Sequence, residues 1–339
     1  MIHPQKLIVP KIPKKNNISS ELPLPYVTIA VNNKCNFACE YCPNKGEAYN
    51  SSPHREFNTE DLKQMIDILE KLGIEKIRLT GGEPLLMDNL EEILTHCEGK
   101  NIEIYIDTNG SLIKERIEVL KKLKGLKIRV SLDTLEKDEF NGICRTYKFD
   151  DVIEGIDLAV ENGLIERINC VVTKRNINQV PLLIDFCRAR KIDLKFLDLY
   201  SEKEKNKYWE QYYVDMTTVY EMFKDQIVSI EQDRYTLTYG MPMNNYNLGD
   251  ITVIIKDSKY GTRYSYEICG QCNCFPCQEG LYSPILSPDY HIMPCRFGKE
   301  FQVPITVENF EVEIQKMIRI FANAKLSNEF WKNKTNEVK

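Results

Sequence analysis

The sequence lacks the features that would direct it to a membrane, a secretory route or a nucleic acid. No apolar run approaches the roughly 20 residues that a bilayer-spanning helix needs. The first residues carry scattered lysines without the apolar core of a signal peptide. The net charge of -5 gives no basic excess for nucleic acid or for an anionic membrane surface. We therefore expect a cytoplasmic protein without nucleic-acid or membrane partners.

Histidine is also scarce, with 4 residues among 339, and His3, His54 and His96 fit no metal-ligand spacing. Cysteine is abundant by contrast, with 12 residues, most of them in two short regions, 35–42 and 269–295. In a chain without a secretion signal, clustered cysteines indicate metal or redox chemistry rather than disulfides. The length and the 42% hydrophobic content are enough for one large domain or two.

The first cysteine group is the triad Cys35, Cys39 and Cys42, in which three and then two residues separate neighbouring cysteines. Three thiolates this close in sequence can bind three irons of a cubane [4Fe–4S] cluster and leave the fourth iron without a protein ligand. That open iron can bind and reduce a small molecule. The alternatives are three reduced structural cysteines, or part of a zinc site, which normally has four ligands.

Apolar periodicity predicts six strands that alternate with helices between residues 26 and 200. The strands are predicted at 27–31, 77–79, 102–106, 128–132, 168–172 and 196–199, and the helices around 59–69 and at 89–97, 113–123, 149–161 and 180–190. This rhythm is typical of an α/β fold built from right-handed βαβ units, and we expect a partial (β/α)6 TIM-type barrel.

The predicted organisation has four parts: an N-terminal arm at 1–25, the barrel at 26–230, a smaller C-terminal region at 231–321, and a polar tail at 322–339. Unusual residues follow the strands, where the chemistry of such barrels lies. They are Cys35 to Cys42, Gly81-Gly82-Glu83, Thr108, Ser131, Asn169 and Leu197. Glycines permit close approach of a backbone, Glu83 offers a carboxylate to an ammonium group, and the neutral side chains suit hydroxyls or a carboxylate.

The triad followed by Gly-Gly-Glu-Pro at 81–84 resembles the radical S-adenosylmethionine (SAM) superfamily. Further segments resemble one branch of it, the GTP 3',8-cyclases of molybdenum-cofactor biosynthesis. These segments are residues 77–86, 130–133, 149–156 and 168–172. The likeness extends from about residue 26 to residue 321 and is dense as far as residue 200.

The resemblance implies a role for each matched residue. Cys35, Cys39 and Cys42 would ligate a [4Fe–4S] cluster whose open iron binds SAM. The expected SAM contacts are Tyr41 and the backbone around Leu197 near the adenine, Gly81, Gly82 and Glu83 at the methionine amino group, and Thr108, Ser131 and Asn169 at the ribose or carboxylate. Reductive cleavage would give a 5'-deoxyadenosyl radical that abstracts hydrogen from a substrate. The electron implies an external donor of the flavodoxin or ferredoxin type.

The second cysteine group comprises Cys269, Cys272, Cys274, Cys277 and Cys295. The cyclases that the sequence resembles bind an auxiliary [4Fe–4S] cluster through Cys-x2-Cys and one later cysteine, so five thiols stand where three are expected. Cys269 and Cys272 match the opening pair, and 285–295 resembles the hairpin that brings the last ligand. Cys274 and Cys277 could replace that pair or add a fourth ligand. Zinc held by two Cys-x2-Cys pairs is the alternative.

The positions at which the cyclases bind GTP do not match. Thr28 and Met87 stand where those enzymes have arginines, no arginine follows either Cys-x2-Cys pair, and the sequence ends without their Gly-Gly tail. Each lost charged contact to a triphosphate costs about 1–3 kcal/mol. The sequence therefore predicts a substrate other than GTP.

Three functions remain open. The first is a radical SAM enzyme, of cyclase, oxidoreductase or lyase type, acting on a small metabolite, nucleoside, sugar or peptide. The second is a GTP 3',8-cyclase with a rebuilt nucleotide site, and the third is a non-catalytic iron–sulfur or zinc protein. Arg145 follows a predicted loop at 141–144 and either contacts the substrate or pairs with a nearby acid. Charged helical sequence is predicted at 202–224, followed by strands at 235–239 and 251–255.

Overall fold

The computed structural model describes residues 24–42, 54–199, 207–232, 243–258, 263–274, 277 and 279–326. The predicted N-terminal arm and polar tail, and a strand expected at 235–239, lie wholly or largely outside these residues. Among the described residues no helix is both long and apolar enough to cross a membrane.

One large sheet organises the protein, and its order is β13-β12-β11-β1-β2-β3-β4-β5-β6-β9-β8-β7. Neighbouring strands are parallel from β11 to β9 in this order, whereas the pairs β13-β12, β12-β11, β9-β8 and β8-β7 are antiparallel. The central strands are β1 (Val27–Asn32), β2 (Lys76–Gly81), β3 (Glu103–Thr108), β4 (Lys127–Ser131), β5 (Ile165–Val172) and β6 (Asp193–Asp198). The outer strands are β7 (Ser229–Gln232), β8 (Met243–Asn247), β9 (Thr252–Lys256), β11 (Ile285–Ser287), β12 (His291–Met293) and β13 (Val303–Pro304). The sheet curves as a partial TIM-type barrel that does not close, as predicted.

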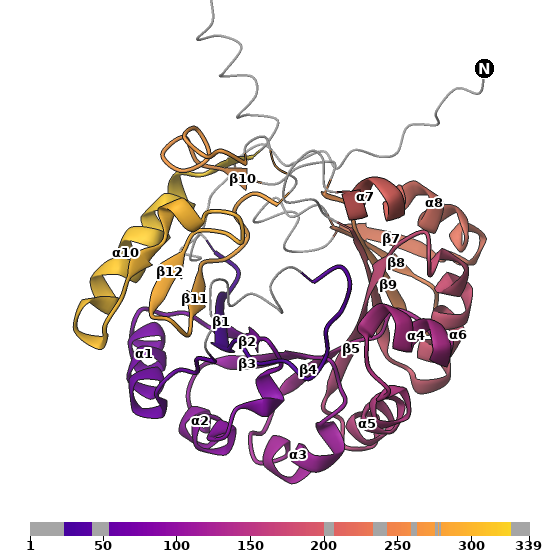
Figure 1. The fold of residues 1–339 in the computed structure, drawn as a ribbon, viewed down its shortest axis with the longest axis horizontal. Helices are drawn as coiled ribbons and strands as arrows, with labels where there is room; N and C mark the ends of the chain where they lie inside the picture. Colours follow the sequence, from indigo (N-terminus) through magenta and orange to yellow (C-terminus); the bar gives the residue numbers. More distant parts are fainter. Residues whose placement is uncertain are drawn as a thin grey trace, which may run out of the picture.

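Helices cover the outer face of this curved sheet (Figure 1). They are α1 (Thr59–Lys71), α2 (Leu90–Cys97), α3 (Ile113–Leu120), α4 (Lys137–Cys144), α5 (Phe149–Glu161) and α6 (Val180–Arg190), then α7 (Lys207–Tyr212), α8 (Met216–Glu221) and α10 (Val307–Asn323). The predicted bounds of α5 and α6 agree with the structure. Helix α1 begins as its sequence indicates, because the Asn58 side chain accepts hydrogen bonds from the N–H groups of Glu60 at 2.9 Å and Asp61 at 3.2 Å.

One local prediction was wrong and one helix was not foreseen. A loop was expected at 141–144, but these residues end helix α4, where Phe140 packs edge-on against Phe37 at 6.0 Å between ring centroids. The charged helical sequence expected over 202–224 is confirmed for the described residues, which form α7, α8 and a short 3-10 helix. Helix α10 was not predicted, although Phe310, Ile314, Met317 and Phe321 form its buried stripe.

Strands from the C-terminal part of the chain complete the barrel wall. Strand β11 lies parallel to β1, with Thr28 opposite Ile285, and β9 lies parallel to β6, with Phe196 opposite Ile255. A small second sheet pairs β10 (Arg263–Tyr264) with β14 (Lys325–Leu326). The division at residue 231 stays a prediction, but strands from both sides of it share one sheet.

Candidate active site

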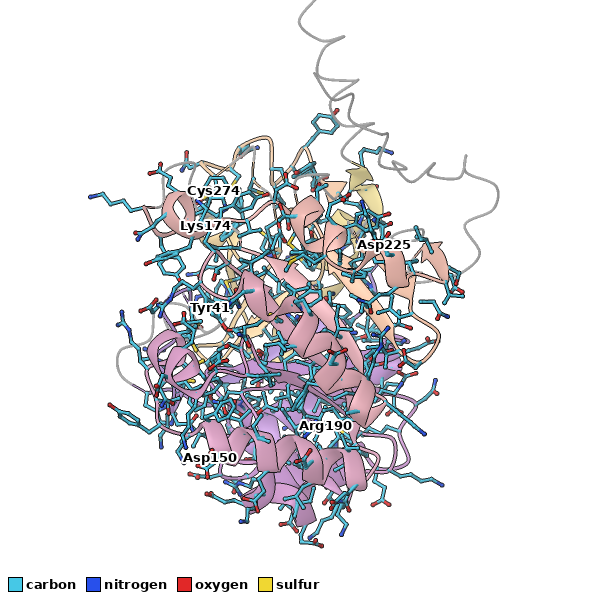
Figure 2. The ribbon with its side chains drawn as sticks, turned by 90° about the vertical axis from the view of Figure 1, so that its right-hand side faces the viewer. Tyr41, Asp150, Lys174, Arg190, Asp225 and Cys274 are labelled. Atoms are coloured by element: carbon cyan, nitrogen blue, oxygen red, sulfur yellow. The ribbon has the colours of Figure 1, made fainter. Side chains whose placement is uncertain are left out.

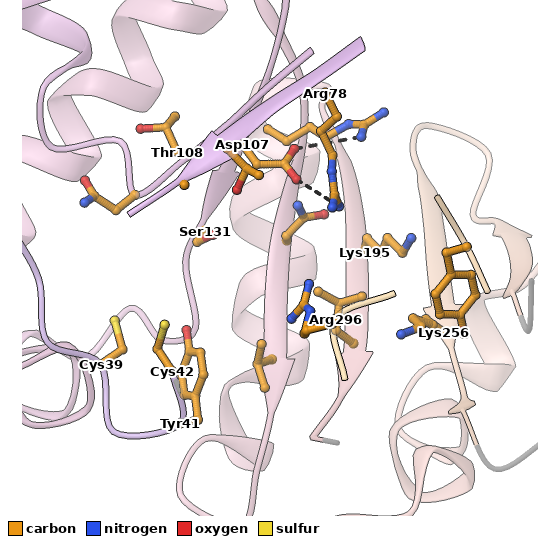
Figure 3. Close-up of a pocket in the computed structure, with 18 of the residues that line it drawn as sticks. Cys39, Tyr41, Cys42, Arg78, Asp107, Thr108, Ser131, Lys195, Lys256 and Arg296 are labelled. Atoms are coloured by element: carbon orange, nitrogen blue, oxygen red, sulfur yellow. Dashed lines mark ion pairs between the residues drawn. The ribbon is translucent and has the colours of Figure 1, made fainter. Parts of the chain in front are cut away.

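A cavity of about 360 Å³ lies at the strand ends, inside the curve of the sheet. Every residue expected to contact SAM or the first cluster lines it: Cys35, Cys39, Tyr41, Cys42, Gly81, Gly82, Glu83, Thr108, Ser131, Asn169 and Leu197. Figure 3 shows Cys39, Tyr41 and Cys42 on one side of this cavity and several basic side chains on another. The barrel topology therefore brings residues from six successive strands to one place.

The cysteine loop is fastened to helix α4. The Ala38 N–H donates to the Cys144 carbonyl at 3.1 Å, and the Glu40 N–H donates to the Ile143 carbonyl at 3.0 Å. Within the loop, the Phe37 N–H donates to Cys35 Sγ at 3.4 Å. Burial raises the pKa of the Cys35 thiol to about 12, so cluster assembly must displace the thiol proton.

Gly81 and Gly82 pack against the backbone of residues 32–34, a contact separate from any that they make with a ligand. A Cβ on Gly82 would lie 2.0 Å from the Lys34 carbonyl oxygen, and one on Gly81 would lie 2.3 Å from that of Asn32. In this contact the Gly82 N–H donates to the Asn32 carbonyl oxygen at 2.9 Å, and the Glu83 N–H donates to the Lys34 carbonyl oxygen at 2.7 Å. These two glycines thus let the β2 loop lock the start of the cysteine loop in position.

Glu83 is a buried carboxylate with a fixed orientation. Its Oε1 accepts hydrogen bonds from Thr108 Oγ1 at 2.6 Å and the Leu85 N–H at 3.0 Å, and its Oε2 accepts one from the Asn109 N–H at 2.8 Å. Burial raises the pKa of Glu83 to about 7 despite these bonds, which lower it. Thr108 therefore holds Glu83 directly, in addition to its expected contact with SAM.

This pKa predicts a pH dependence for SAM binding. Below about pH 7 the Glu83 carboxyl is protonated and offers no charge to the methionine ammonium, whereas above it the carboxylate is ionised. We expect the dissociation constant for SAM to fall as pH rises from about 6 to about 8, by at most about tenfold per unit below the pKa. Calorimetric titration of the reconstituted protein measures this. In Glu83→Gln the slope should vanish, and an unchanged slope in that variant would contradict the assignment.

A hydrogen bond to Asp133 holds Tyr41 in place, and this pair was not predicted from the sequence. Tyr41 Oη donates to Asp133 Oδ2 at 2.6 Å, and the Val171 N–H donates to Asp133 Oδ1 at 2.8 Å. Burial raises the pKa of Asp133 to about 6. This arrangement fixes the ring of Tyr41 against the ends of β4 and β5, where the adenine contact is expected.

A cluster of basic side chains lines the same cavity, and sequence reasoning missed it. Its members, hereafter the cation cluster, are Arg78, Arg129, Arg167, Lys195, Lys256 and Arg296. Asp107 pairs with Arg78 at 3.4 Å and with Arg129 at 3.8 Å, as the dashed lines in Figure 3 indicate. Glu166 pairs with Arg129 and, at 3.4 Å, with Arg167.

Some members of the cation cluster are close enough to repel one another. Burial and the nearby Arg129 both lower the pKa of Arg167, although Glu166 lies beside it. Lys256 and Arg296 lie 3.6 Å and 4.0 Å from the buried carboxylate of Glu279, and Asp198 is a second buried acid beside Lys256. An anion in the cavity would relieve this repulsion.

A signal for this cluster was present in the sequence. Arg78, Arg129 and Lys195 each stand between two apolar residues that are buried in a strand. Because side chains alternate between the two faces of a strand, such a cation must point to the inner face of the barrel. Three strands with this pattern, β2, β4 and β6, indicate an anion site.

Thr28 and Met87 occupy the two positions at which the cyclases have arginine, and neither residue lines the cavity. Met87 is fully buried, and Thr28 is fully buried with its hydroxyl 2.8 Å from that of Ser283. Arg145 does not line the cavity among the described residues. Its guanidinium lies 4.0 Å from Glu40, which fits the second of its two expected roles.

The second cysteine group lies beside the cavity, and Cys295 and Glu279 line its wall. Among the described residues, no three His, Cys, Asp or Glu side chains form a group that could hold a single metal ion. A cubane cluster has a different requirement, because each thiolate binds a different iron. The thiols of Cys35, Cys39 and Cys42 border one cavity, with Glu83 and the strand ends opposite, and this donor set fits a cluster with bound SAM.

Comparisons with known proteins agree with this geometry. Residues 29–187 match the Radical SAM superfamily. The chain is 29% identical over 311 residues to the GTP 3',8-cyclase of Aquifex aeolicus, covering 87% of this chain and 89% of that one. It is 30% identical over 292 residues to a probable GTP 3',8-cyclase of Methanocella arvoryzae, covering 84% and 86%.

Solved structures share the fold. Streptococcus suis SuiB bound to S-adenosylmethionine superposes with a TM-score of 0.60 at 21% identity over 85% of this chain, which spans 64% of the length of SuiB. A structure of anSMEcpe with bound AdoMet and the Kp18Cys peptide gives a TM-score of 0.56 at 18% identity, covering 86% of this chain and 79% of that one. At these identities the likeness concerns the fold alone.

Proposed function

Because this chain belongs to the radical SAM superfamily, we propose that it cleaves SAM reductively and uses the resulting radical on GTP, as a GTP 3',8-cyclase does. The observation that carries the proposal is the presence of the cysteine triad and the cation cluster in one cavity. When bound, the [4Fe–4S] cluster and SAM together supply a one-electron cleavage that forms a 5'-deoxyadenosyl radical.

The residues of the chain position SAM in this proposal. Cys35, Cys39 and Cys42 hold the cluster. Glu83 receives the methionine ammonium on a carboxylate that three hydrogen bonds already orient. Tyr41, held by Asp133, lies against the adenine. The curved sheet excludes water from the reacting atoms.

The cation cluster supports a triphosphate as the anion. Arginine side chains bind phosphate through two N–H groups, and buried arginines lose less hydration than lysines when they do so. Arg78, Arg129, Arg167 and Lys195 come from strands β2, β4, β5 and β6 and would together face several phosphate oxygens. The nucleoside would then extend from this wall toward the SAM end of the cavity.

The expectation of a substrate other than GTP depended on arginines missing from the positions at which the cyclases have them, and on the missing Gly-Gly tail. Cations at other positions line the cavity, and they support a triphosphate site without those arginines. The relatives named GTP 3',8-cyclase also favour GTP over another substrate. We therefore place the rebuilt nucleotide site first, and a different phosphorylated substrate second.

A deuterium-transfer experiment tests the substrate. Joining C3' to C8 requires loss of the hydrogen on C3', so GTP deuterated at C3' should yield 5'-deoxyadenosine that carries deuterium. Anaerobically reconstituted protein, a reductant and SAM are mixed with the labelled GTP, and mass spectrometry measures the label. GTP deuterated at C8 and unlabelled ATP are the controls. Unlabelled 5'-deoxyadenosine from C3'-deuterated GTP would exclude GTP and leave the SAM chemistry standing.

We also propose that the second cysteine group holds an auxiliary [4Fe–4S] cluster. Cys295 lines the substrate cavity, so a cluster there would border the substrate. An external donor of the flavodoxin or ferredoxin type would supply the electron for SAM cleavage. Iron analysis distinguishes the cases, since two cubanes give about eight irons and one cubane with a zinc site gives about four irons plus zinc.

A further inference from the structure

The cysteine loop is held from a second side by Arg175, which lies in the loop after β5. The guanidinium of Arg175 makes two ion pairs. Its Nη1 donates to Glu40 Oε2 at 2.5 Å, and its Nε donates to Glu139 Oε1 at 2.8 Å. Glu40 belongs to the cysteine loop and lies between Cys39 and Tyr41. Because Glu139 belongs to helix α4, one side chain links three segments that are far apart in the sequence.

Helix α4 leaves room for this guanidinium at Gly142. A Cβ at that position would lie 3.1 Å from Arg175 Nη2, which is tighter than ordinary van der Waals contact. The carbonyls of the next two residues of α4 accept the hydrogen bonds from the backbone of the cysteine loop. The backbone of that loop and the Glu40 side chain are therefore fastened to the same end of α4.

The backbone that carries Arg175 is itself fixed by buried hydrogen bonds. Asn176 Oδ1 accepts from the Thr173 N–H at 2.7 Å, and Asn176 Nδ2 donates to the Asp133 carbonyl at 2.8 Å. Thr173 and Asn176 are both buried. Asp133 also holds Tyr41 through its carboxylate. Arg175 thus projects from a rigid support that shares an anchor with the cysteine loop.

The pair of Arg175 and Glu40 is better shielded than a typical surface ion pair. Their side chains are 23% and 21% exposed, so water screens their attraction less than at an open surface. Two carboxylates also fix the plane of one guanidinium. Arg145 is a more distant partner of Glu40, at 4.0 Å, and its side chain is 63% exposed. Arg175 is therefore the cation that holds Glu40 in place.

We propose that Arg175 is a positioning residue for the first cluster: it holds the cysteine loop through Glu40, and its charge offsets that of Glu40 beside the cluster. The potential of an iron–sulfur cluster depends on the charge around it as well as on its ligands. An uncompensated carboxylate next to Cys39 would oppose the addition of an electron. The inference rests on the cysteine triad as the cluster site and is independent of the identity of the substrate.

The test uses the full chain with its clusters reconstituted anaerobically. Three variants form a double-mutant cycle: Arg175→Gln, Glu40→Gln and the two changes combined. The EPR signal of the first cluster is identified by its change when SAM is added. A redox titration of that signal gives the midpoint potential, and its decay in the presence of an iron chelator gives the rate of cluster loss.

We expect the two single variants to shift the potential in opposite directions. Arg175→Gln removes a cation, so the potential should fall, whereas Glu40→Gln removes an anion, so the potential should rise. Each variant breaks the ion pair and should lose the cluster about 2- to 10-fold faster than the wild type. The double variant should have a potential near that of the wild type and lose the cluster no faster than either single variant.

Two further variants separate this role from a general effect on stability. Arg175→Lys keeps the charge and loses the planar fork, so the potential should stay near the wild-type value while cluster loss accelerates. Arg190→Gln is the matched control, because Arg190 pairs with Asp157 at 2.7 Å and its side chain is 24% exposed. Figure 2 shows Arg190 on the helical layer, apart from Tyr41 and Lys174. This control should leave both measurements unchanged.

Three results would overturn the inference. The first is a wild-type rate of cluster loss in Arg175→Gln. The second is an unchanged potential in both single variants, which would leave Arg175 with a structural role only. The third is a loss in the double variant that equals the sum of the two single effects, because residues that act as a pair are not additive. Circular dichroism establishes that each variant is folded, and no GTP is added at any point.

Discussion

Replacing Cys35 by alanine should abolish the release of 5'-deoxyadenosine from SAM. The cavity has one cysteine loop with three thiols, and a cubane held by the two that remain has two irons without protein ligands. We expect the rate to fall below detection, which means a loss of at least about a thousandfold. Chromatography of anaerobic reactions that contain reconstituted protein, reductant and SAM measures the product.

Cys97→Ala is the matched control for this variant. Cys97 is a buried cysteine of helix α2 that packs in the hydrophobic core and lies outside the cavity lining. Its replacement removes one thiol and leaves both cysteine groups intact, so activity should be retained. Equal product from wild type and Cys35→Ala would show that the triad does not hold the catalytic cluster.

Replacing Arg167 by glutamine should weaken GTP binding by about 10- to 150-fold. One charged hydrogen-bonding contact to phosphate contributes about 1.5–3 kcal/mol, and glutamine keeps an amide but no charge. Burial and Arg129 already disfavour the charge on Arg167 in the free protein. Its removal should therefore leave the melting temperature unchanged or raise it, even as affinity falls. Calorimetric titration with GTP measures the affinity.

Two other variants make this result specific. Arg167→Lys keeps the charge and loses the planar fork, so its affinity should lie between those of wild type and glutamine. Arg188→Gln removes an arginine of helix α6 that pairs with Asp250 at 3.2 Å, outside the cavity lining, and should bind GTP normally. Because Arg167 also donates to Asn169 at 3.0 Å, SAM binding is measured in parallel. Unchanged GTP binding in Arg167→Gln would contradict the phosphate assignment.

The order of elements in the barrel was readable from local pattern. Helices α5 and α6 have clear apolar stripes, and their predicted bounds agree with the structure. Helix α4 was missed because its apolar residues face a contact, Phe37 against Phe140, that joins segments about one hundred positions apart. Helix α10 carries an equally regular apolar stripe, although no helix was predicted there.

Gly81 and Gly82 were correctly placed at the site, but the structure gives a second reason why glycine is required there. From the sequence, Gly81 and Gly82 were expected to allow the close approach of a ligand. The structure shows the carbonyl oxygens of Asn32 and Lys34 at the positions that side chains would occupy. A close contact between β1 and the loop after β2 is a tertiary fact that no local pattern contains.

By itself the sequence determined which chemistry the first cysteine group is suited to, and that this group lies at the strand ends of the barrel. Those features are local: the spacing of three thiols, the Gly-Gly-Glu turn, and an alternation of strand and helix that places strand ends together. Only the tertiary structure decided that Arg78, Arg129, Arg167, Lys195, Lys256 and Arg296 share one cavity with the triad. These cations come from separate strands, and their combined field exists only once the sheet has curved and brought the strands side by side. A motif comparison reads positions one at a time, whereas an anion responds to the sum of the charges around it.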